Sequence, residues 1–286
     1  MRFTGKVRQI VRVSIAVVAA AFAVMAYTFL TLPDVRVLAT TNPSTTAFIE
    51  LRAAEARAAG KRPRRVQVWI PYTHVSKNLT RAVLVAEDDL FWEHEGVDVE
   101  QLRQSIRADL AKGAAVRGGS TITQQLAKNL YLSPSRNPLR KLRELVIARR
   151  LEAALPKARI FELYLNVIEW GDGIWGAEAA ARTYFRASAS AVSPQQAALL
   201  AGAIVNPRVL SPAHPTSRLL RRQRIILGRM GAVEPPPPMP TSPPPPAVVT
   251  EAPPTPEVTA PSPEVVPGVS GNSDANETPS GSSPQP

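Results

Sequence analysis

Three acidic residues, Glu87, Asp88 and Asp89, follow an apolar run at residues 82–86. A carboxylate beside apolar surface has a raised pKa, because burial disfavours its charged form. A raised pKa suits a general base that works near neutral pH. The solvated end of an ordinary helix also carries such charges, so this segment alone does not establish catalysis.

A glycine pair, Gly118 and Gly119, precedes a segment rich in hydroxyl and amide side chains. Glycines that lead into a helix favour anion binding, because the first N–H groups of the helix are free. Four residues of the segment lie at i, i+3, i+4 and i+7 and would form one polar stripe on a helix: Thr121, Gln124, Gln125 and Lys128. A glycine pair is also common as a plain turn, but a polar stripe ending in lysine beside such a turn is less common.

A third segment places Glu144 among the cations Arg136, Arg140 and Lys141. Glu144 lies four residues after Arg140 and three after Lys141, a spacing that also fits an ordinary ion pair on a helix surface. The functional interpretation is a carboxylate among cations that hold a pyrophosphate, either directly or through a divalent ion.

Helices must position these groups, because apolar residues recur at helical spacing through residues 66–230. Ser76 is expected to cap the helix that leads to Ala86, and Ser120 to cap a helix over residues 121–130. Further helices are expected at residues 51–62, 99–112, 138–154, 157–166, 177–185, 195–203 and 218–230. Residues 66–70 are the one strand candidate, and residues 171–176 are expected to form a loop. The predicted fold class is mainly α, with a single core.

The N-terminus predicts a membrane anchor. Basic residues at positions 2, 6, 8 and 12 precede residues 13–32, which carry no charge. A helix of that length, at ~1.5 Å per residue, spans the ~30 Å hydrocarbon core of a bilayer. A cleaved signal peptide has a shorter apolar stretch, ~7–15 residues, and ends at small residues. The basic residues predict that the N-terminus lies in the cytoplasm and that everything after the helix lies on the opposite side of the membrane.

Five parts are therefore predicted along the chain: a cytoplasmic N-terminus (1–12), a transmembrane anchor (13–32), a juxtamembrane linker (33–65), a globular domain (66–231) and a tail (232–286). The basic end of the linker, residues 61–65, either touches anionic lipid headgroups or is simply solvated. The tail holds 18 of the 29 prolines and no Lys or Arg, so we expect it to be disordered.

Charge and composition narrow the function further. The absence of cysteine excludes disulfides, zinc knuckles and thiol catalysis. Residues 1–231 carry a net charge of +17, which indicates an anionic partner such as nucleic acid, a phospholipid surface or a phosphorylated substrate. Because the predicted domain lies on the side of the membrane opposite the cytoplasm, nucleic acid is not an expected partner.

In this order and spacing, the segments resemble the monofunctional peptidoglycan glycosyltransferases of glycosyltransferase family 51, which are related to the glycosyltransferase domain of class A penicillin-binding proteins. The first family motif has every fixed position filled, by Glu87, Asp88, Phe91, His94 and Gly96. The second motif (residues 118–125 with Lys128 and Asn129) and the third (Arg140, Lys141 and Glu144) are complete. The fourth, residues 157–166, departs only at Phe161. The fifth is incomplete, because Gln223 stands where a second arginine follows Arg222; Arg221 and Arg224 are candidate substitutes.

The resemblance implies a lysozyme-like α fold with a second, membrane-facing lobe, and an enzyme that polymerises lipid II. The growing glycan on undecaprenyl pyrophosphate would be the donor, and an inverting attack by the 4-hydroxyl of lipid II would form a β-1,4 bond. Glu87 corresponds to the general base and Glu144 to the second acidic residue. The pyrophosphate would meet Lys128, Arg136, Arg140 and Lys141. Substrate contacts are further expected from Asp88, Phe91, His94, Gly119, Ser120, Thr121, Gln124, Gln125 and Asn129.

The resemblance requires no organic cofactor and leaves a divalent cation, Mg or Mn, open at Glu144. The expected partners are lipid II, the growing glycan, membrane lipid and other proteins of wall synthesis or division. The nearest alternative is a lytic transglycosylase or lysozyme-type hydrolase, which cleaves neutral glycan and has no need of the cations. A non-catalytic, membrane-anchored scaffold is the other alternative. A transpeptidase is excluded, because neither Ser-x-x-Lys nor Lys-Thr-Gly occurs.

Overall fold

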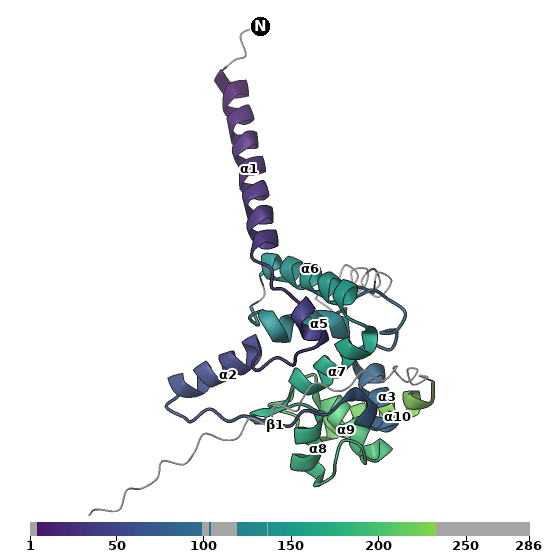
Figure 1. The fold of residues 1–286 in the computed structure, drawn as a ribbon. Coiled ribbons are helices and arrows are strands. Elements are labelled where there is room, and N and C mark those ends of the chain that lie inside the picture. Colours follow the sequence, from purple (N-terminus) through teal and green to yellow (C-terminus); the bar gives the residue numbers. More distant parts are fainter. Residues whose placement is uncertain (1–4, 99–102, 104–118, 136, 233–286) are drawn as a thin grey trace, which may run out of the picture. The chain divides into compact units, whose positions relative to one another are not determined.

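The computed structural model describes residues 5–98, 103, 119–135 and 137–232, and helices dominate them (Figure 1). The α-helices are α1 (Gly5–Leu30), α2 (Ala47–Ala58), α3 (Lys77–Glu87), α5 (Ile122–Tyr131), α6 (Pro138–Ala154), α7 (Lys157–Val167), α8 (Ala177–Phe185), α9 (Pro194–Ala203) and α10 (Ser217–Arg229). Short 3-10 helices are η1 (Arg36–Ala39), η2 (Tyr72–His74) and η3 (Met230–Ala232). The predicted mainly α, lysozyme-like fold class is confirmed. The predicted helix over residues 99–112, apart from Arg103, and the predicted tail from residue 233 on lie outside the described residues.

The N-terminal helix begins earlier than predicted. Helix α1 starts at Gly5 and includes Arg8 and Arg12, and its segment apolar enough to cross a membrane is Val7–Thr28. Arginine is a good helix former, so a charge limits the membrane-compatible segment without ending the helix. Large apolar side chains on this segment are exposed, among them Ile10 and Phe22. Within the described part of the chain, α1 alone has the length and apolar composition of a membrane span.

Helix α2 is also shifted from its predicted position at residues 51–62. It begins at Ala47 because the hydroxyl of Thr46 accepts a hydrogen bond from the backbone N–H of Ile49, at 3.1 Å. It ends at Ala58, two residues before Gly60, which has φ +68°. Glycine favours this left-handed conformation, which commonly ends a helix.

Three short strands, β1 (Val66–Gln67), β2 (Glu169–Gly171) and β3 (Ile174–Trp175), form a sheet in the order β1-β3-β2. The predicted strand at 66–70 is shortened, because the backbone N–H and carbonyl of Ile70 form hydrogen bonds with the side chain of Asn166 instead of with a strand. The segment expected as a loop at 171–176 instead belongs to the β2–β3 hairpin. Two- and three-residue strands are too short to show alternation in a sequence.

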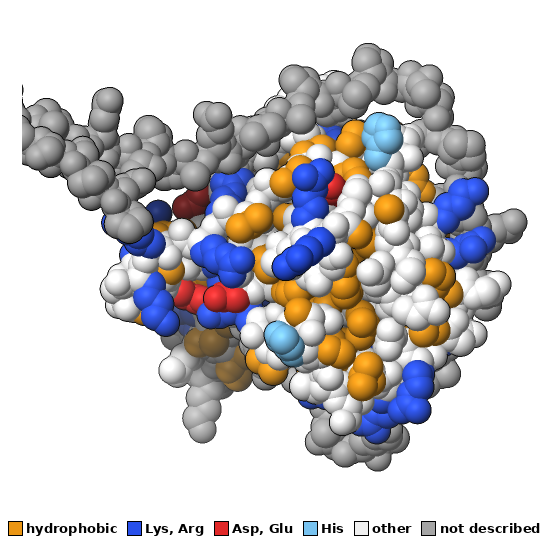
Figure 2. All heavy atoms as spheres, turned by 90° about the horizontal axis from the view of Figure 1, so that it is seen from below, with side chains coloured by type: hydrophobic (Ala, Val, Ile, Leu, Met, Phe, Trp, Pro, Cys, Tyr) orange, Lys and Arg blue, Asp and Glu red, His pale blue; other side chains and the backbone are white. Residues whose placement is uncertain are grey.

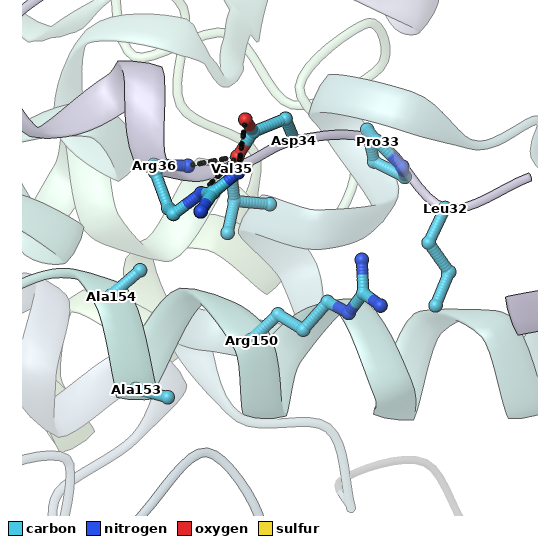
Figure 3. Close-up of a pocket in the computed structure, with 8 residues that line it drawn as sticks. All are labelled: Leu32, Pro33, Asp34, Val35, Arg36, Arg150, Ala153 and Ala154. Carbon is cyan, nitrogen blue, oxygen red and sulfur yellow. Dashed lines mark hydrogen bonds and ion pairs between the residues drawn. The ribbon is translucent and has the colours of Figure 1, made fainter. Parts of the chain in front are cut away.

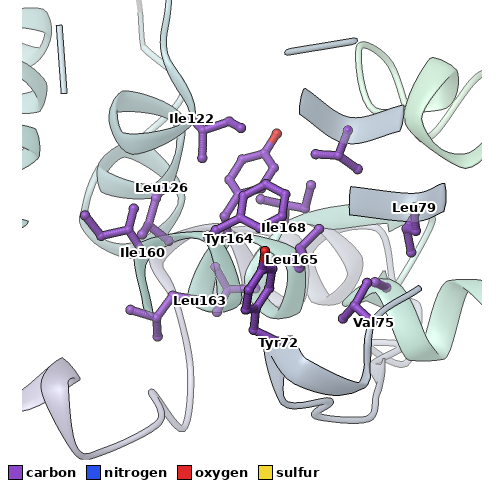
Figure 4. Close-up of a cluster of buried hydrophobic side chains, with 14 of the residues drawn as sticks. Tyr72, Val75, Leu79, Ile122, Leu126, Ile160, Leu163, Tyr164, Leu165 and Ile168 are labelled. Carbon is purple, nitrogen blue, oxygen red and sulfur yellow. The ribbon is translucent and has the colours of Figure 1, made fainter. Parts of the chain in front are cut away.

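Helix α7 is the centre of the core, and every residue after Lys157 in it is buried. Its apolar side chains Leu163, Tyr164 and Leu165 lie among those of neighbouring elements, including Ile122 and Leu126 of α5 (Figure 4). A helix buried on all sides is apolar all round, apart from polar residues that find partners.

The polar residues of α7 fix the backbone that leads into α3. The amide of Asn166 donates to the carbonyl of Ile70 and accepts from its N–H, both at 2.8 Å. A carboxylate oxygen of Glu162 accepts from the N–H of Tyr72, also at 2.8 Å. Ser76 then caps α3 as predicted, by accepting from the N–H of Leu79. The fourth motif therefore sets where α3 begins, and with it where Glu87 lies.

Candidate active site

Glu87 is the last residue of α3, and its side chain is half-buried. Its Oε2 accepts a hydrogen bond from Nε2 of Gln125, at 2.9 Å. The Oε1 atom of Gln125 in turn accepts from the hydroxyl of Tyr164, at 3.1 Å. Through these contacts, the buried Tyr164 of α7 helps to fix the orientation of the Glu87 carboxylate. No hydrogen bond from a described residue reaches the other oxygen of Glu87, which is therefore an available proton acceptor.

The pKa of Glu87 is raised above its ordinary value of 4.5, and burial is the main cause. The hydrogen bond from Gln125 and the charges of Arg222 and Lys128 act in the opposite direction, while Asp88 raises the pKa further. The apolar run before Glu87 predicted the direction of this shift and its main cause, but not the opposing contacts. A carboxyl group with a raised pKa is a stronger base once it is ionised.

Asp88 and His94 connect the loop after α3 to the start of α5. The Oδ2 atom of Asp88 accepts from the N–H of Ile122 at 2.9 Å, and both carboxylate oxygens lie 3.0 Å from Nε2 of His94. Because Nδ1 of His94 accepts from the N–H of Gly96, the proton of a neutral ring is on Nε2. Both side chains are largely buried, so these contacts hold the loop after α3 against the start of α5. Contact of Asp88 and His94 with substrate stays a prediction.

Two more residues of the first motif are internal. Phe91 is fully buried, with its ring against Phe161 and Trp92. Gly96 has φ +80°, and a Cβ there would lie 3.0 Å from the side chain of Glu152. Only glycine fits that backbone without strain.

The start of α5 differs in one detail from the prediction. Thr121, not Ser120, is the N-cap, and its hydroxyl also donates to the carbonyl of Gly96 at 2.8 Å. Both residues are good caps, and the choice follows from the neighbours. Ser120 instead accepts a hydrogen bond from Lys141, at 3.1 Å. Gln124 donates to Gly96 at 3.1 Å, so the first and second motifs are joined at this glycine.

The predicted cations lie together around Glu144. Glu144 is buried, and its two carboxylate oxygens form ion pairs with Arg140 and Lys141. Lys141 also donates to Oε1 of Gln124, at 2.8 Å, so the third motif contacts the second. Arg136 and Gly118 lie outside the described residues.

Lys128 has a lowered pKa, first because it is partly buried and then because Arg140 and Lys141 repel its charge; Glu144 raises it. Its ammonium forms no hydrogen bond with the described residues and lies 5.8 Å from the ring centroid of Phe48. A cation without a close anionic partner, one helical turn from Gln125, is well placed to meet a phosphate.

Of the predicted polar stripe, Gln125 and Lys128 line a pocket of about 180 Å³ that also involves α2, the start of β2 and the segment after α9, whereas Thr121 and Gln124 are buried against Gly96. Its lining residues are Phe48, Arg52, Gln125, Lys128, Asn129, Ile168, Glu169, Ile204, Val205 and Pro207. Asn129 is held by its own helix, donating to the carbonyl of Gln125 at 2.8 Å. Gly119 lies two residues before Thr121, the N-cap of α5, and residues 104–118 before it lie outside the described part of the chain.

Glu169 in this pocket was not predicted. Its Oε2 pairs with Nε of Arg52, at 3.0 Å, while its Oε1 is buried without a hydrogen-bond partner in the described part of the chain. Burial raises the pKa of Glu169, and Arg52 opposes that rise. The only sequence clue was its position three residues after the fourth motif.

Arg222 is the functional candidate that the incomplete fifth motif left open. Its Nε donates to the carbonyl of Gly202 at 3.0 Å, and its charge lowers the pKa of Glu87. Arg221 and Arg224 are exposed. Gln223, where the family has arginine, donates to the carbonyl of Gln195 and so connects α10 to α9.

Both oxygens of Glu144 form ion pairs with cationic side chains, so a divalent cation at Glu144 would have to displace Arg140 or Lys141. The described residues contain no group of three or more His, Asp or Glu that could hold a metal, so a cation at Glu144 would need the phosphates of the substrate as further ligands.

A larger pocket, of about 650 Å³, lies between the segment that follows α1 (residues 32–36) and α6 (Figure 3). Asp34 in its wall forms a two-point ion pair with Arg36, which lowers the pKa of Asp34 to about 2. A carboxylate with so low a pKa is a weak base. This pocket includes none of the predicted site residues.

Comparisons with known proteins agree with the motifs. A family model described as Transglycosylase matches residues 28–231. A biosynthetic peptidoglycan transglycosylase of Dechloromonas aromatica is 47% identical over 195 residues, which cover 68% of this chain and 84% of the relative. Proteins of the same description from Nitrosospira multiformis and Aromatoleum aromaticum are 46% and 51% identical, over 68% and 58% of this chain and 85% and 73% of theirs.

Proposed function

Because the chain belongs to the transglycosylase family of monofunctional peptidoglycan glycosyltransferases, we propose that it polymerises lipid II into β-1,4-linked glycan, without transpeptidase activity. The observation that carries this proposal is the arrangement along α5. Gln125 orients the proposed base, Glu87, and Lys128, one turn further, joins the cations around Glu144.

In the proposed reaction Glu87 accepts the proton of the 4-hydroxyl of lipid II as that oxygen attacks the anomeric carbon of the donor. The bond from the anomeric carbon to the pyrophosphate oxygen breaks, and its electron pair leaves with undecaprenyl pyrophosphate. Attack opposite the leaving group converts an α-linked donor to a β product. Lys128, Arg140 and Lys141 neutralise the charge that develops on the leaving group, and such preorganised charges often contribute more to the rate than any other feature of an active site.

The cations also separate this function from hydrolysis. A lysozyme-type enzyme cleaves neutral glycan and has no pyrophosphate to stabilise. Here burial lowers the pKa of Lys128, and the charges of Arg140 and Lys141 lower it as well, while Glu144 opposes them. Three cations around one buried carboxylate support a substrate that supplies further negative charge.

Purified full-length chain, incubated in detergent with labelled lipid II, should form long glycan and release undecaprenyl pyrophosphate. Preformed glycan in a parallel reaction should stay intact. Breakdown of that glycan would identify a hydrolase, and no reaction in either assay would favour a scaffold.

We further propose that the chain crosses the bacterial inner membrane once through α1, with the N-terminus in the cytoplasm. The exposed apolar side chains of Val7–Thr28 and the basic residues Arg8 and Arg12 support this orientation. A reporter fused after Met230 should be active only outside the cytoplasm, and the same reporter before Met1 only inside. The protein should remain in membranes after a high-salt wash. A soluble, processed form that begins near Val35 would contradict the anchor.

A further inference from the structure

A second pocket of about 180 Å³ lies next to the one beside Lys128, and Arg52 lines both. It is formed by the C-terminal part of α2, the segment that follows it, the β2–β3 turn and Arg208. None of the sequence motifs includes these residues.

The floor of this pocket is a network of ion pairs. Arg52 pairs with Glu169 at 3.0 Å and with Glu55 at 2.9 Å. Arg208 lies 3.3 Å from Glu55 and 3.5 Å from Asp172. The two arginines are thus matched by three carboxylates, and neither is an unpaired cation.

The rim of the pocket carries the positive charge. Lys61, Arg62 and Arg64 are exposed and form no ion pair with the described residues. On the face drawn in Figure 2, Lys and Arg side chains likewise gather around a small group of acidic ones. These three cations, over a floor of mixed charge, leave the pocket net positive.

The rim is held in place by backbone contacts. The N–H of Val66 donates to the carbonyl of Gly173 at 2.8 Å, and the guanidinium of Arg65 donates to the carbonyl of Ser44 at 2.6 Å. Gly173 has φ +68°, and a Cβ there would lie 2.7 Å from the carbonyl oxygen of Arg64. Glycine at this position lets the chain around Arg64 lie directly against the hairpin.

We propose that this pocket binds the charged peptides carried by the glycan strand, with Arg62 and Arg64 receiving their carboxylates. The proposal rests on the proposed function, since it assigns the pocket to part of that substrate. Arg52 lines both this pocket and the Lys128 pocket, so a strand that extends from the reacting groups past Arg52 would enter the second pocket. Each peptide ends in a carboxylate, for which a guanidinium is a matched partner.

Anionic lipid headgroups are the competing occupant of this basic rim. Two observations favour the peptide. Carboxylates as well as cations line the pocket, because Glu55 and Asp172 belong to it, and this mixed charge suits a peptide with both amino and carboxylate groups better than a uniformly anionic surface. The pocket beside the segment that follows α1, close to where a bilayer would end, shares no residue with this one.

The test compares two soluble probes on full-length chain in phosphatidylcholine nanodiscs: uncross-linked glycan fragments with their peptides, and the same fragments after an amidase has removed the peptides. The chain should bind the peptide-bearing fragments at least about threefold more tightly at low ionic strength, an effect typical of a few exposed ion pairs. The double variant R62Q/R64Q should lose this preference. R57Q, which removes an exposed arginine on α2 outside the pocket, should keep it.

Equal binding of both probes by the unmodified chain, or a preference that survives in R62Q/R64Q, would overturn the proposal. In a parallel preparation whose nanodiscs also contain phosphatidylglycerol, loss of bound phosphatidylglycerol from R62Q/R64Q in native mass spectra, without any peptide preference, would assign the rim to lipid and also overturn the proposal. Polymerisation of lipid II is measured separately. If the chain polymerises but shows no peptide preference, only this inference fails; if it does not polymerise, the proposed function fails first.

Discussion

Replacing Glu87 by glutamine should lower the rate of glycan polymerisation by ~10²–10⁴-fold, the range typical of general-base loss. Glutamine keeps the shape and can still meet Gln125, but it accepts no proton. Binding of a pyrophosphate-bearing substrate analogue should survive, because Lys128, Arg140 and Lys141 are unchanged. Initial rates on labelled lipid II and equilibrium binding of the analogue measure the two effects separately.

The matched control is Glu95→Gln, which removes an exposed carboxylate of the same loop whose one ion pair with a described residue is to Arg149, at the surface. It should polymerise at nearly the unmodified rate. Near-normal activity of Glu87→Gln would remove the base from the mechanism and direct attention to Glu144.

The pH profile gives an independent test of the same assignment. Glu87 must be ionised to accept a proton, so kcat/KM should rise as the pH increases through its raised pKa, above 4.5. Gln125→Met removes the hydrogen bond that lowers this pKa. The acidic limb should therefore move to higher pH. An unchanged limb would mean that another group titrates.

The sequence predicted which residues gather at the site better than it predicted what each one does there. Helical spacing alone put Gln125 and Lys128 on one face of α5, because residues three apart on a helix are neighbours. Asp88 and His94 belong to the same sequence motif as Glu87. Their partners, the N–H groups of Ile122 and Gly96, depend on how the loop folds back on α5, and no local pattern records that approach.

Contacts between distant segments were the main omission. The Arg52–Glu169 pair joins residues 117 positions apart, and nothing near either residue indicates the other. For the fourth motif the pattern was recognised but the role of its polar residues was not. The side chains of Asn166 and Glu162 accept hydrogen bonds from the backbone N–H groups of residues 70 and 72. Local patterns predict helices well, whereas polar contacts in a core follow from the packing of helices already formed.

Lys128→Ala should lower kcat/KM by ~10²–10³-fold, the loss typical of removing one group that stabilises charge in a transition state. Unlike Glu87→Gln, it should also weaken binding of the pyrophosphate analogue, because the lost charge meets the phosphate before and during reaction. Lys77→Ala, which removes an exposed lysine at the start of α3, is the control and should change neither quantity. Unaltered binding by Lys128→Ala would place the pyrophosphate elsewhere.

Glu144→Gln then separates a supporting carboxylate from a reacting one. Glu144 raises the pKa of Lys128, whereas burial, Arg140 and Lys141 lower it. Without the charge of Glu144, the pKa of Lys128 should fall further. Because only the ammonium form of Lys128 attracts phosphate, the basic limb of the kcat/KM profile should then move to lower pH. Lys128→Arg, whose guanidinium stays charged, should remove this limb. If Glu144 itself accepted the proton, Glu144→Gln would lower the rate at every pH and leave the basic limb in place, and that result would contradict its role as the counter-charge of the cations.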